Sequence, residues 1–196
     1  GAKTVRDPLG TSIAWDSADA NTLATLLSDP RLFVQRRATA ALRRMNTAAV
    51  APVQRVASEH ASPDVRRRAI WTLAGIEDLS ARKSVIVGLS DTDASVRQAA
   101  VHAAGLHRDA SVLPQLLTIV QSDEPGPARA AAEAIGRLHN ASAVPELLEA
   151  VSNLKLSGSD PSGAPAMASE RIREHALIYA MVEIDDAEQT RGGLVL

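Results

Sequence analysis

The chain has 196 residues, no cysteine and a formal net charge of −2 at pH 7. Hydrophobic residues make up 45% of it and aromatic residues only 2%. A core made of Ala, Leu, Val and Ile suits closely packed helices. The composition excludes wholesale disorder, disulfides and cysteine chemistry. The small net charge gives no general attraction to nucleic acid or to anionic membranes.

Charge is unevenly distributed along the chain. Residues 1–82 carry 12 Lys and Arg against 8 Asp and Glu, a balance of +4, whereas the remainder carries 9 against 15, a balance of −6. No run of about 18 apolar residues is present, so we expect no membrane span.

Residues 1–18 have no helical period, and Asp7-Pro8-Leu9-Gly10 is typical of a turn. We expect this segment to be a linker, or an arm lying against the first repeat with Trp15 as its anchor.

From residue 19 the sequence repeats every 31 residues. Three series of positions carry the period: Ala38, Ala69, Ala100 and Ala131; then Leu42, Leu73, Ala104 and Ile135; and, four residues before each Ala, Val34, Val65, Val96 and Pro127. The period predicts about five units within 19–190, at residues 19–47, 48–78, 79–109, 110–140 and 141–186.

Each unit is expected to hold two helices joined by a polar connector that caps the second helix. The first helices are predicted at 22–27, 52–57, 83–89, 113–120 and 144–151. The second helices are predicted at 32–45, 64–76, 95–106, 127–138 and 169–184. One hairpin cannot bury both of its apolar faces, so several must stack. The predicted fold is therefore all-α, a right-handed α-α superhelix of about five hairpins.

The last part of the chain departs from the period. Residues 153–165 are rich in Ser, Gly and Pro and lengthen the loop of the fifth unit. This insertion is either a surface excursion or a functional loop. Residues 187–196 are expected to begin a further helix or a truncated repeat.

The string from Asp91 to Gly105, Asp-Thr-Asp-Ala-Ser-Val-Arg-Gln-Ala-Ala-Val-His-Ala-Ala-Gly, resembles the HEAT-repeat motif. The pairs Val65-Arg66 and Ile172-Arg173 echo its Val-Arg pair. The resemblance implies a HEAT/ARM-type solenoid in which an Asp and an Arg form a ladder between repeats. Gln35 and Ala128 replace the Arg in the first and fourth units, so the ladder is expected to be broken there.

Two shorter stretches, residues 26–38 and 171–184, resemble the helical segment of large secreted planctomycete-type proteins. Those proteins place such a segment between an N-terminal propeller dehydrogenase-like domain and a C-terminal c-type cytochrome. The resemblance implies a spacer in a larger bacterial multidomain protein, with a periplasmic or secreted location. Without it, a cytoplasmic location is expected.

No catalytic or metal-binding pattern is found. The five His form no HExxH motif, and there is no GxSxG turn and no Gly-rich phosphate loop. HEAT-fold di-iron hydroxylases use repeated adjacent His-Glu pairs, but this chain has only the reversed Glu174-His175. We therefore expect no catalytic residue, no metal and no cofactor.

Second helices normally line the concave face of such a stack, where Trp and Arg dominate binding hot spots. The candidate binding residues on that face are Arg36, Arg67, Arg68, Trp71, His102 and Arg129. In the alternative interpretation Trp71 packs between repeats and the arginines are merely solvated.

The expected function is a non-catalytic scaffold or protein-interaction module that binds a protein partner or flanking domains of the same chain. Nucleic-acid binding through an Arg/Trp patch and a lyase or hydroxylase activity are the alternatives; neither is favoured by the residues.

Overall fold

The computed structural model describes residues 6–122, 124–154 and 164–195, and all the regular structure within them is helical. The chain divides into two compact units, residues 1–100 and 101–196, with the division inside one helix. Most of the predicted loop insertion, residues 155–163, lies outside the described residues, as do the side chains of 164–169 and 194–195.

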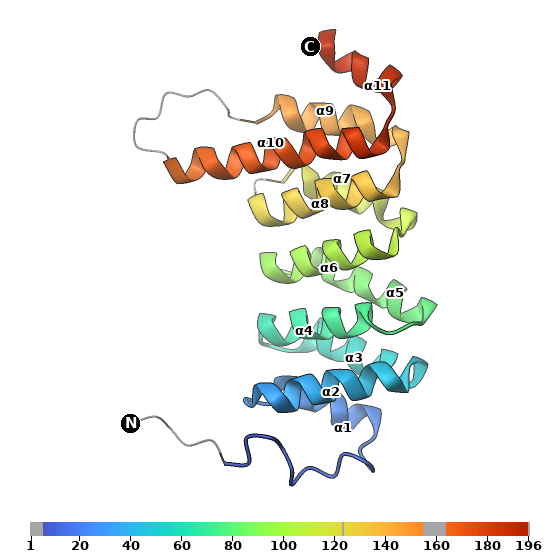
Figure 1. The fold of residues 1–196 in the computed structure, drawn as a ribbon, viewed down its shortest axis with the longest axis vertical. Coiled ribbons are helices and arrows are strands. Elements are labelled where there is room, and N and C mark those ends of the chain that lie inside the picture. The colour runs from blue at the N-terminus through green and yellow to red at the C-terminus, as the bar shows by residue number, and fades with distance from the viewer. Residues whose placement is uncertain (1–5, 123, 155–163, 196) are drawn as a thin grey trace. The chain divides into compact units, whose positions relative to one another are not determined.

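The first unit is built from helical hairpins. Figure 1 shows α2 and α4 on the near side of this unit, with α1 and α3 behind them. Its elements are α1 (Ala20–Thr25) with a 3₁₀ turn (Leu26–Ser28), α2 (Leu32–Met45), α3 (Thr47–Glu59), α4 (Pro63–Ala74), α5 (Leu79–Val85) with a 3₁₀ turn (Ile86–Ser90), and the start of α6 (Ala94–His107).

The second unit continues the hairpin pattern, with α8 and α10 on the near side and α7 and α9 behind them (Figure 1). After the end of α6 it contains a 3₁₀ turn (Ala110–Val112), α7 (Leu113–Val120), α8 (Pro125–Leu138), a 3₁₀ turn (Ala141–Ala143), α9 (Val144–Ser152), α10 (Ala164–Ile184), α11 (Ala187–Arg191) and a last 3₁₀ turn (Gly192–Val195).

The predicted helices agree closely with the structure, and the ranges 32–45 and 113–120 are confirmed as predicted. The largest differences are at the starts of α3 and α10, each five residues before the predicted start: α3 begins at Thr47 and not at Pro52, and α10 begins at Ala164 and not at residue 169. Pro52 lies inside α3, where it removes one backbone hydrogen bond. The alanines before it have high helix propensity, which favours the earlier start.

The 31-residue period identifies buried positions. All twelve residues of the three series are buried: Val34, Ala38, Leu42, Val65, Ala69, Leu73, Val96, Ala100, Ala104, Pro127, Ala131 and Ile135. The small side chains let helices approach closely while still removing apolar surface from water.

The fifth repeat does not follow the predicted register. Ile172 is 54% exposed, whereas Arg173 is only 7% exposed and its Nη2 donates to the carbonyl of Val120 at 2.9 Å. Counted from Arg173, the third, fourth and seventh residues onward are Ala176, Leu177 and Ala180, and all three are buried, as the matching residues of α8 are. Arg173 therefore takes the place of the expected valine, and the pair Ile172-Arg173 is not a true Val-Arg pair.

The predicted Asp–Arg ladder has one strong rung in the first unit. Arg66 donates through Nε and Nη2 to both carboxylate oxygens of Asp91, each at 2.7 Å, although the two residues belong to successive repeats. The Arg66 and Asp91 side chains are only 11% and 8% exposed. Gln35 is too short and uncharged to form such a rung, and its Nε2 instead donates to the Asp29 carbonyl at 2.6 Å.

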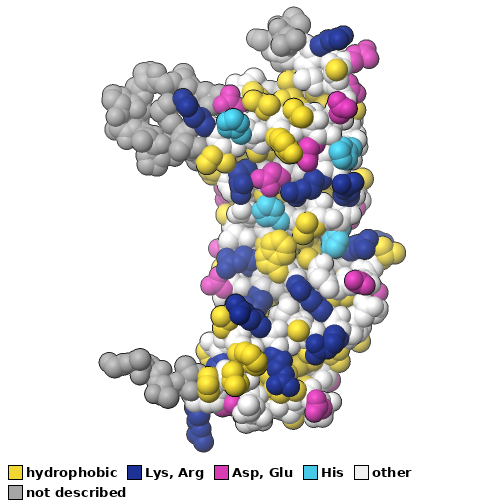
Figure 2. Space-filling model, in the orientation of Figure 1, with side chains coloured by type: hydrophobic (Ala, Val, Ile, Leu, Met, Phe, Trp, Pro, Cys, Tyr) yellow, Lys and Arg dark blue, Asp and Glu magenta, His cyan; other side chains and the backbone are white. Residues whose placement is uncertain are grey.

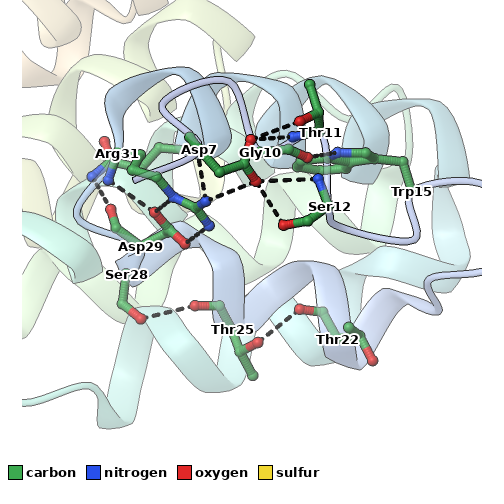
Figure 3. A network of polar contacts seen from close by, with 11 residues as sticks. Asp7, Gly10, Thr11, Ser12, Trp15, Thr22, Thr25, Ser28, Asp29 and Arg31 are labelled. Atoms are coloured by element: carbon green, nitrogen blue, oxygen red, sulfur yellow. Dashed lines mark hydrogen bonds and ion pairs between the residues drawn. The ribbon is translucent and has the colours of Figure 1, made fainter. Parts of the chain in front are cut away.

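The N-terminal segment folds against the first hairpin, as Figure 3 shows. The Asp7 carboxylate accepts hydrogen bonds from the backbone N–H and hydroxyl groups of Thr11 and Ser12 at 2.6–3.1 Å. These hydrogen bonds, the one from the Ser12 hydroxyl foremost, lower the pKa of Asp7. Arg31 joins the segment to the hairpin, because its Nη1 donates to the Asp7 carbonyl at 3.0 Å and its Nη2 to Asp29 at 2.8 Å.

Trp15 anchors the same segment. Its indole N–H donates to the Gly10 carbonyl at 2.7 Å, and the guanidinium carbon of Arg37 in α2 lies 4.4 Å from the centre of its ring. Gly10 is buried, with a left-handed φ of +67°. A Cβ there would lie 2.7 Å from Cγ2 of Val34, so only glycine fits this turn.

Replacing Gly10 by alanine is expected to detach this segment, because both the positive φ and the contact with Val34 oppose a Cβ. The expected cost is about 2 kcal/mol. Hydrogen exchange of the Trp15 indole N–H, followed by NMR, should become about tenfold faster or more. Leu9→Ala, at an exposed neighbour, should leave that rate unchanged; equal rates in the two variants would contradict the docking.

Candidate functional site

Arg36, Arg67, Arg68 and Trp71 all come from the first unit, on α2 and α4. Figure 2 shows this face, with Lys and Arg side chains gathered over the two helices. The sequence thus correctly places the four residues on two neighbouring second helices, but their surroundings differ.

The Arg67 side chain forms hydrogen bonds with residues of its own repeat and of the next repeat. Its Nη2 donates to Asp64 at 2.7 Å and its Nη1 to the Ser95 hydroxyl at 3.1 Å. The charge of Arg67 is therefore partly satisfied by the protein itself.

Arg68 has a structural contact and also faces a groove. Its Nη1 donates a short hydrogen bond to the carbonyl of Leu27, where the first 3₁₀ turn leaves that group without a helical partner. Burial lowers the pKa of Arg68, but an arginine stays protonated at neutral pH. Arg68 is thus a partly desolvated cation.

A groove of about 320 Å³ lies between α2 and α4. It is lined by Leu32, Gln35, Arg36, Thr39, Ala40, Arg43 and Arg68. Within the described residues, none of its three arginines forms a salt bridge, and no acidic side chain lines the groove. We call this feature the arginine groove.

Arg43 belongs to the arginine groove but was not predicted from the sequence. It lies seven residues after Arg36, two helical turns further along the same face of α2, and this spacing could have identified it. Its Nη2 donates to the carbonyl of Trp71 at 2.8 Å.

Trp71 projects from α4 with 37% of its surface exposed. It is therefore neither fully buried between repeats nor fully solvated. A half-exposed indole beside cationic side chains combines an apolar surface with charge, as binding hot spots commonly do.

His102 and Arg129 lie in the second unit, where both approach Glu133. Arg129 Nη1 donates to Glu133 Oε1 at 2.9 Å, and His102 Nδ1 lies 4.0 Å from Glu133 Oε2. Burial lowers the pKa of His102, against the opposing effect of Glu133. The Glu133 carboxylate pairs with Arg129. These three residues therefore differ from the arginine groove, whose arginines form no salt bridge within the described residues.

The described residues hold no group of three or more His, Asp or Glu side chains placed to bind a metal ion. Within the same ranges no helix is both long and apolar enough to cross a membrane.

Comparison with known proteins identifies the type of repeat. Residues 50–136 match the family model of HEAT repeats, and residues 127–153 match that of PBS lyase HEAT-like repeats. A search of the curated proteins found no match.

Two solved structures resemble the chain. Human deoxyhypusine hydroxylase in complex with glycerol is 18% identical, with a TM-score of 0.50 over 85% of this chain and 62% of that chain. An engineered protein is 18% identical, with a TM-score of 0.45 over 82% of this chain and 80% of that chain. At this level of identity the likeness to the hydroxylase concerns the fold alone, and the chain spans less than two thirds of that enzyme's length.

The fold and the two family-model matches define an all-helical repeat protein of the α-α solenoid type. Residues 50–136 contain HEAT repeats, as the motif around Asp91 and Val96 predicts.

Proposed function

We propose that this HEAT-repeat chain is a non-catalytic interaction module whose arginine groove binds an acidic segment of a partner protein. The observation that supports this proposal most directly is that one groove is lined by Arg36, Arg43 and Arg68 and by no carboxylate.

Two other arginines of the first unit show how an arginine with a structural role is bound in this protein. Arg31 is paired with Asp29, and Arg66 with Asp91, each at 2.7–2.8 Å and mostly shielded from water. The arginine groove lacks such partners, so a ligand carboxylate can supply them. Guanidinium groups bind carboxylates through paired, charge-assisted hydrogen bonds.

The groove also suits a peptide with apolar residues between its acids. Leu32 and Ala40 line it beside the cations, and Leu32 is 57% exposed. Burying this apolar surface adds to the attraction, and Trp71 on the same face extends the apolar area.

Reversing the charge of Arg36 tests the proposal cleanly, because Arg36 is exposed and makes no hydrogen bond or ion pair within the described structure. Arg36→Glu should weaken binding of a fluorescein-labelled peptide of alternating Glu and Leu by about tenfold, measured by fluorescence anisotropy. Higher salt should weaken the wild-type complex more than the variant complex.

Arg44→Glu is the matched control, since Arg44 is exposed on α2 outside the groove and its reversal changes the net charge equally. It should change the affinity by less than about twofold. Equal losses of peptide affinity in Arg36→Glu and Arg44→Glu would mean that the peptide responds to the overall charge of the chain and not to the groove. Tighter binding of duplex DNA than of the peptide would favour the nucleic-acid alternative instead.

We further propose, from the resemblance of residues 26–38 and 171–184, that the module lies between a propeller dehydrogenase-like domain and a c-type cytochrome in a longer secreted protein. The support is that the two stretches take similar places in the fold, since residues 32–38 of the first lie in α2 and the whole of the second lies in α10. Sequencing the intact polypeptide tests this. A Cys-x-x-Cys-His haem-attachment motif downstream would support it, and other flanking domains would refute it.

A further inference from the structure

Two of the three arginines in the arginine groove are held in place by backbone carbonyls. Arg43 Nη2 donates to the carbonyl of Trp71, which is among the last four carbonyls of α4, the groups that a helix leaves without a partner of its own. Arg68 Nη1 donates to the carbonyl of Leu27 in the first 3₁₀ turn. Because a guanidinium has five N–H groups, both side chains keep donors for a ligand.

Gly75 makes the position of Arg43 possible. It follows the last residue of α4, and a Cβ there would collide with Nε and Cζ of the Arg43 side chain. The φ of Gly75 is −96°, which residues with a side chain also adopt, so the backbone itself does not require glycine here. The guanidinium of Arg43 thus fills the space that the absent side chain leaves.

The two fixed guanidinium groups belong to different ends of the groove. Val34 and Val65 are equivalent positions of α2 and α4, and equivalent residues of stacked repeats lie level with each other. Arg68 follows Val65 by three residues, whereas Arg43 follows Val34 by nine. The difference of six residues corresponds to about 9 Å along the helices. Arg36, two residues after Val34, lies at the same end as Arg68.

Short side chains line the groove between these two ends. They are Thr39 and Ala40, and the Thr39 hydroxyl lies 3.5 Å from that of Thr72 in α4. A ligand helix can therefore lie along the two helices and reach both cationic ends. In such a helix, residues seven positions apart share one face and lie about 10 Å apart, which matches the separation of the two ends.

We propose that the arginine groove binds a helical segment of a partner protein that carries two acidic residues seven positions apart, and that Gly75 is the positioning residue for Arg43. This inference rests on the proposed function and adds the spacing of the acidic groups. One carboxylate binds Arg36 and Arg68, and the other binds Arg43. Since carbonyls hold Arg43 and Arg68 before the ligand arrives, less side-chain entropy is lost on binding.

Two fluorescein-labelled peptides of about 20 residues, rich in alanine and glutamine, test the spacing. Their compositions are identical, but one carries its two Glu residues at positions i and i+7, on one face of the helix, and the other at i and i+5, on different faces. Fluorescence anisotropy should show at least about fivefold tighter binding of the i, i+7 peptide to the full chain. Equal affinities would overturn the proposed spacing, whereas no binding of either peptide would refute the proposed function itself.

Gly75→Ala tests the positioning role, because the added methyl group occupies the space of the Arg43 guanidinium. The affinity for the i, i+7 peptide should fall about fivefold, to that for the i, i+5 peptide. The midpoint of urea unfolding should not fall, since alanine is compatible with the backbone conformation at this position.

The same substitution in the Arg43→Ala chain separates positioning from a general effect on the fold. If Gly75 acts only through Arg43, then Gly75→Ala should cause no further loss of peptide affinity in that background. An equal loss of affinity with and without the Arg43 side chain would overturn the positioning role of Gly75.

Discussion

Replacing Gly136 by valine is expected to destabilise the second unit by about 3 kcal/mol. Gly136 lies where α8 and α10 pack, and an added Cβ would meet the Glu183 carboxylate and lie 3.0 Å from Cα of Ala180. The glutamate side chain can move, but the helix backbone of α10 cannot move without opening the interface. Urea unfolding followed by circular dichroism measures the loss.

Gly192→Val is the control for this prediction. No heavy atom of the described structure lies within 4 Å of the position of a Cβ at Gly192. Its variant should change the free energy of unfolding by less than about 0.5 kcal/mol. Similar losses at the two glycines would mean that the close approach of α8 and α10 contributes little.

Removing the Arg66 guanidinium should be about as costly to the first unit. Arg66→Ala leaves the Asp91 carboxylate mostly buried without its cation, and it also frees the carbonyl of His60, which Arg66 Nη1 contacts at 2.8 Å. Breaking a shielded ion pair on one side costs about 3 kcal/mol. The free energy of unfolding in urea is again the measurement.

Arg67→Ala provides the contrast. The Arg67–Asp64 pair has the same 2.7 Å separation, but its side chains are 41% and 69% exposed. We expect a loss below about 0.5 kcal/mol, because water screens such a pair. Comparable losses in the two variants would contradict the distinction between shielded and exposed arginines.

The Arg66–Asp91 ion pair also predicts how the stability of the first unit depends on pH at acidic pH. Burial, the largest single effect, raises the pKa of Asp91, but the hydrogen bonds from Arg66 and from the Asp93 backbone N–H, together with the charge of Arg66, lower it more, so the net shift is downward. The stabilisation is present above the ordinary pKa of aspartate and is lost as the pH falls through the lowered pKa. Arg66→Ala should therefore weaken the acid dependence of stability as well as the stability at neutral pH.

Much of the fold was predictable because each repeat carries its own pattern. Val34, Ala38 and Leu42 recur at one spacing, and that spacing marks the buried side of a helix. The pattern failed in the fifth repeat, where an insertion precedes α10 and removes the fixed distance that set the register. Choosing Ile172 as the apolar landmark was chemically reasonable, but the structure buries Arg173 instead, because Val120 offers its guanidinium a carbonyl.

The candidate site was predictable only in part. Periodicity places Arg36, Arg68 and Trp71 on second helices, but it cannot show which arginines find a carboxylate. Asp91 pairs with Arg66 from the preceding repeat, 25 residues away in sequence. Arg43 was not predicted, although it lies seven residues after Arg36 on the same face of α2.

The measurement closest to the central claim is an NMR titration of the 15N-labelled chain with the acidic peptide. Backbone amide shifts should cluster on the residues of the arginine groove, with Leu32, Thr39 and Arg43 among the largest, and the Trp71 indole signal should move with them. Arg36→Glu should diminish the whole set. Shifts spread evenly over the surface, or centred on residues of the second unit, would contradict the account.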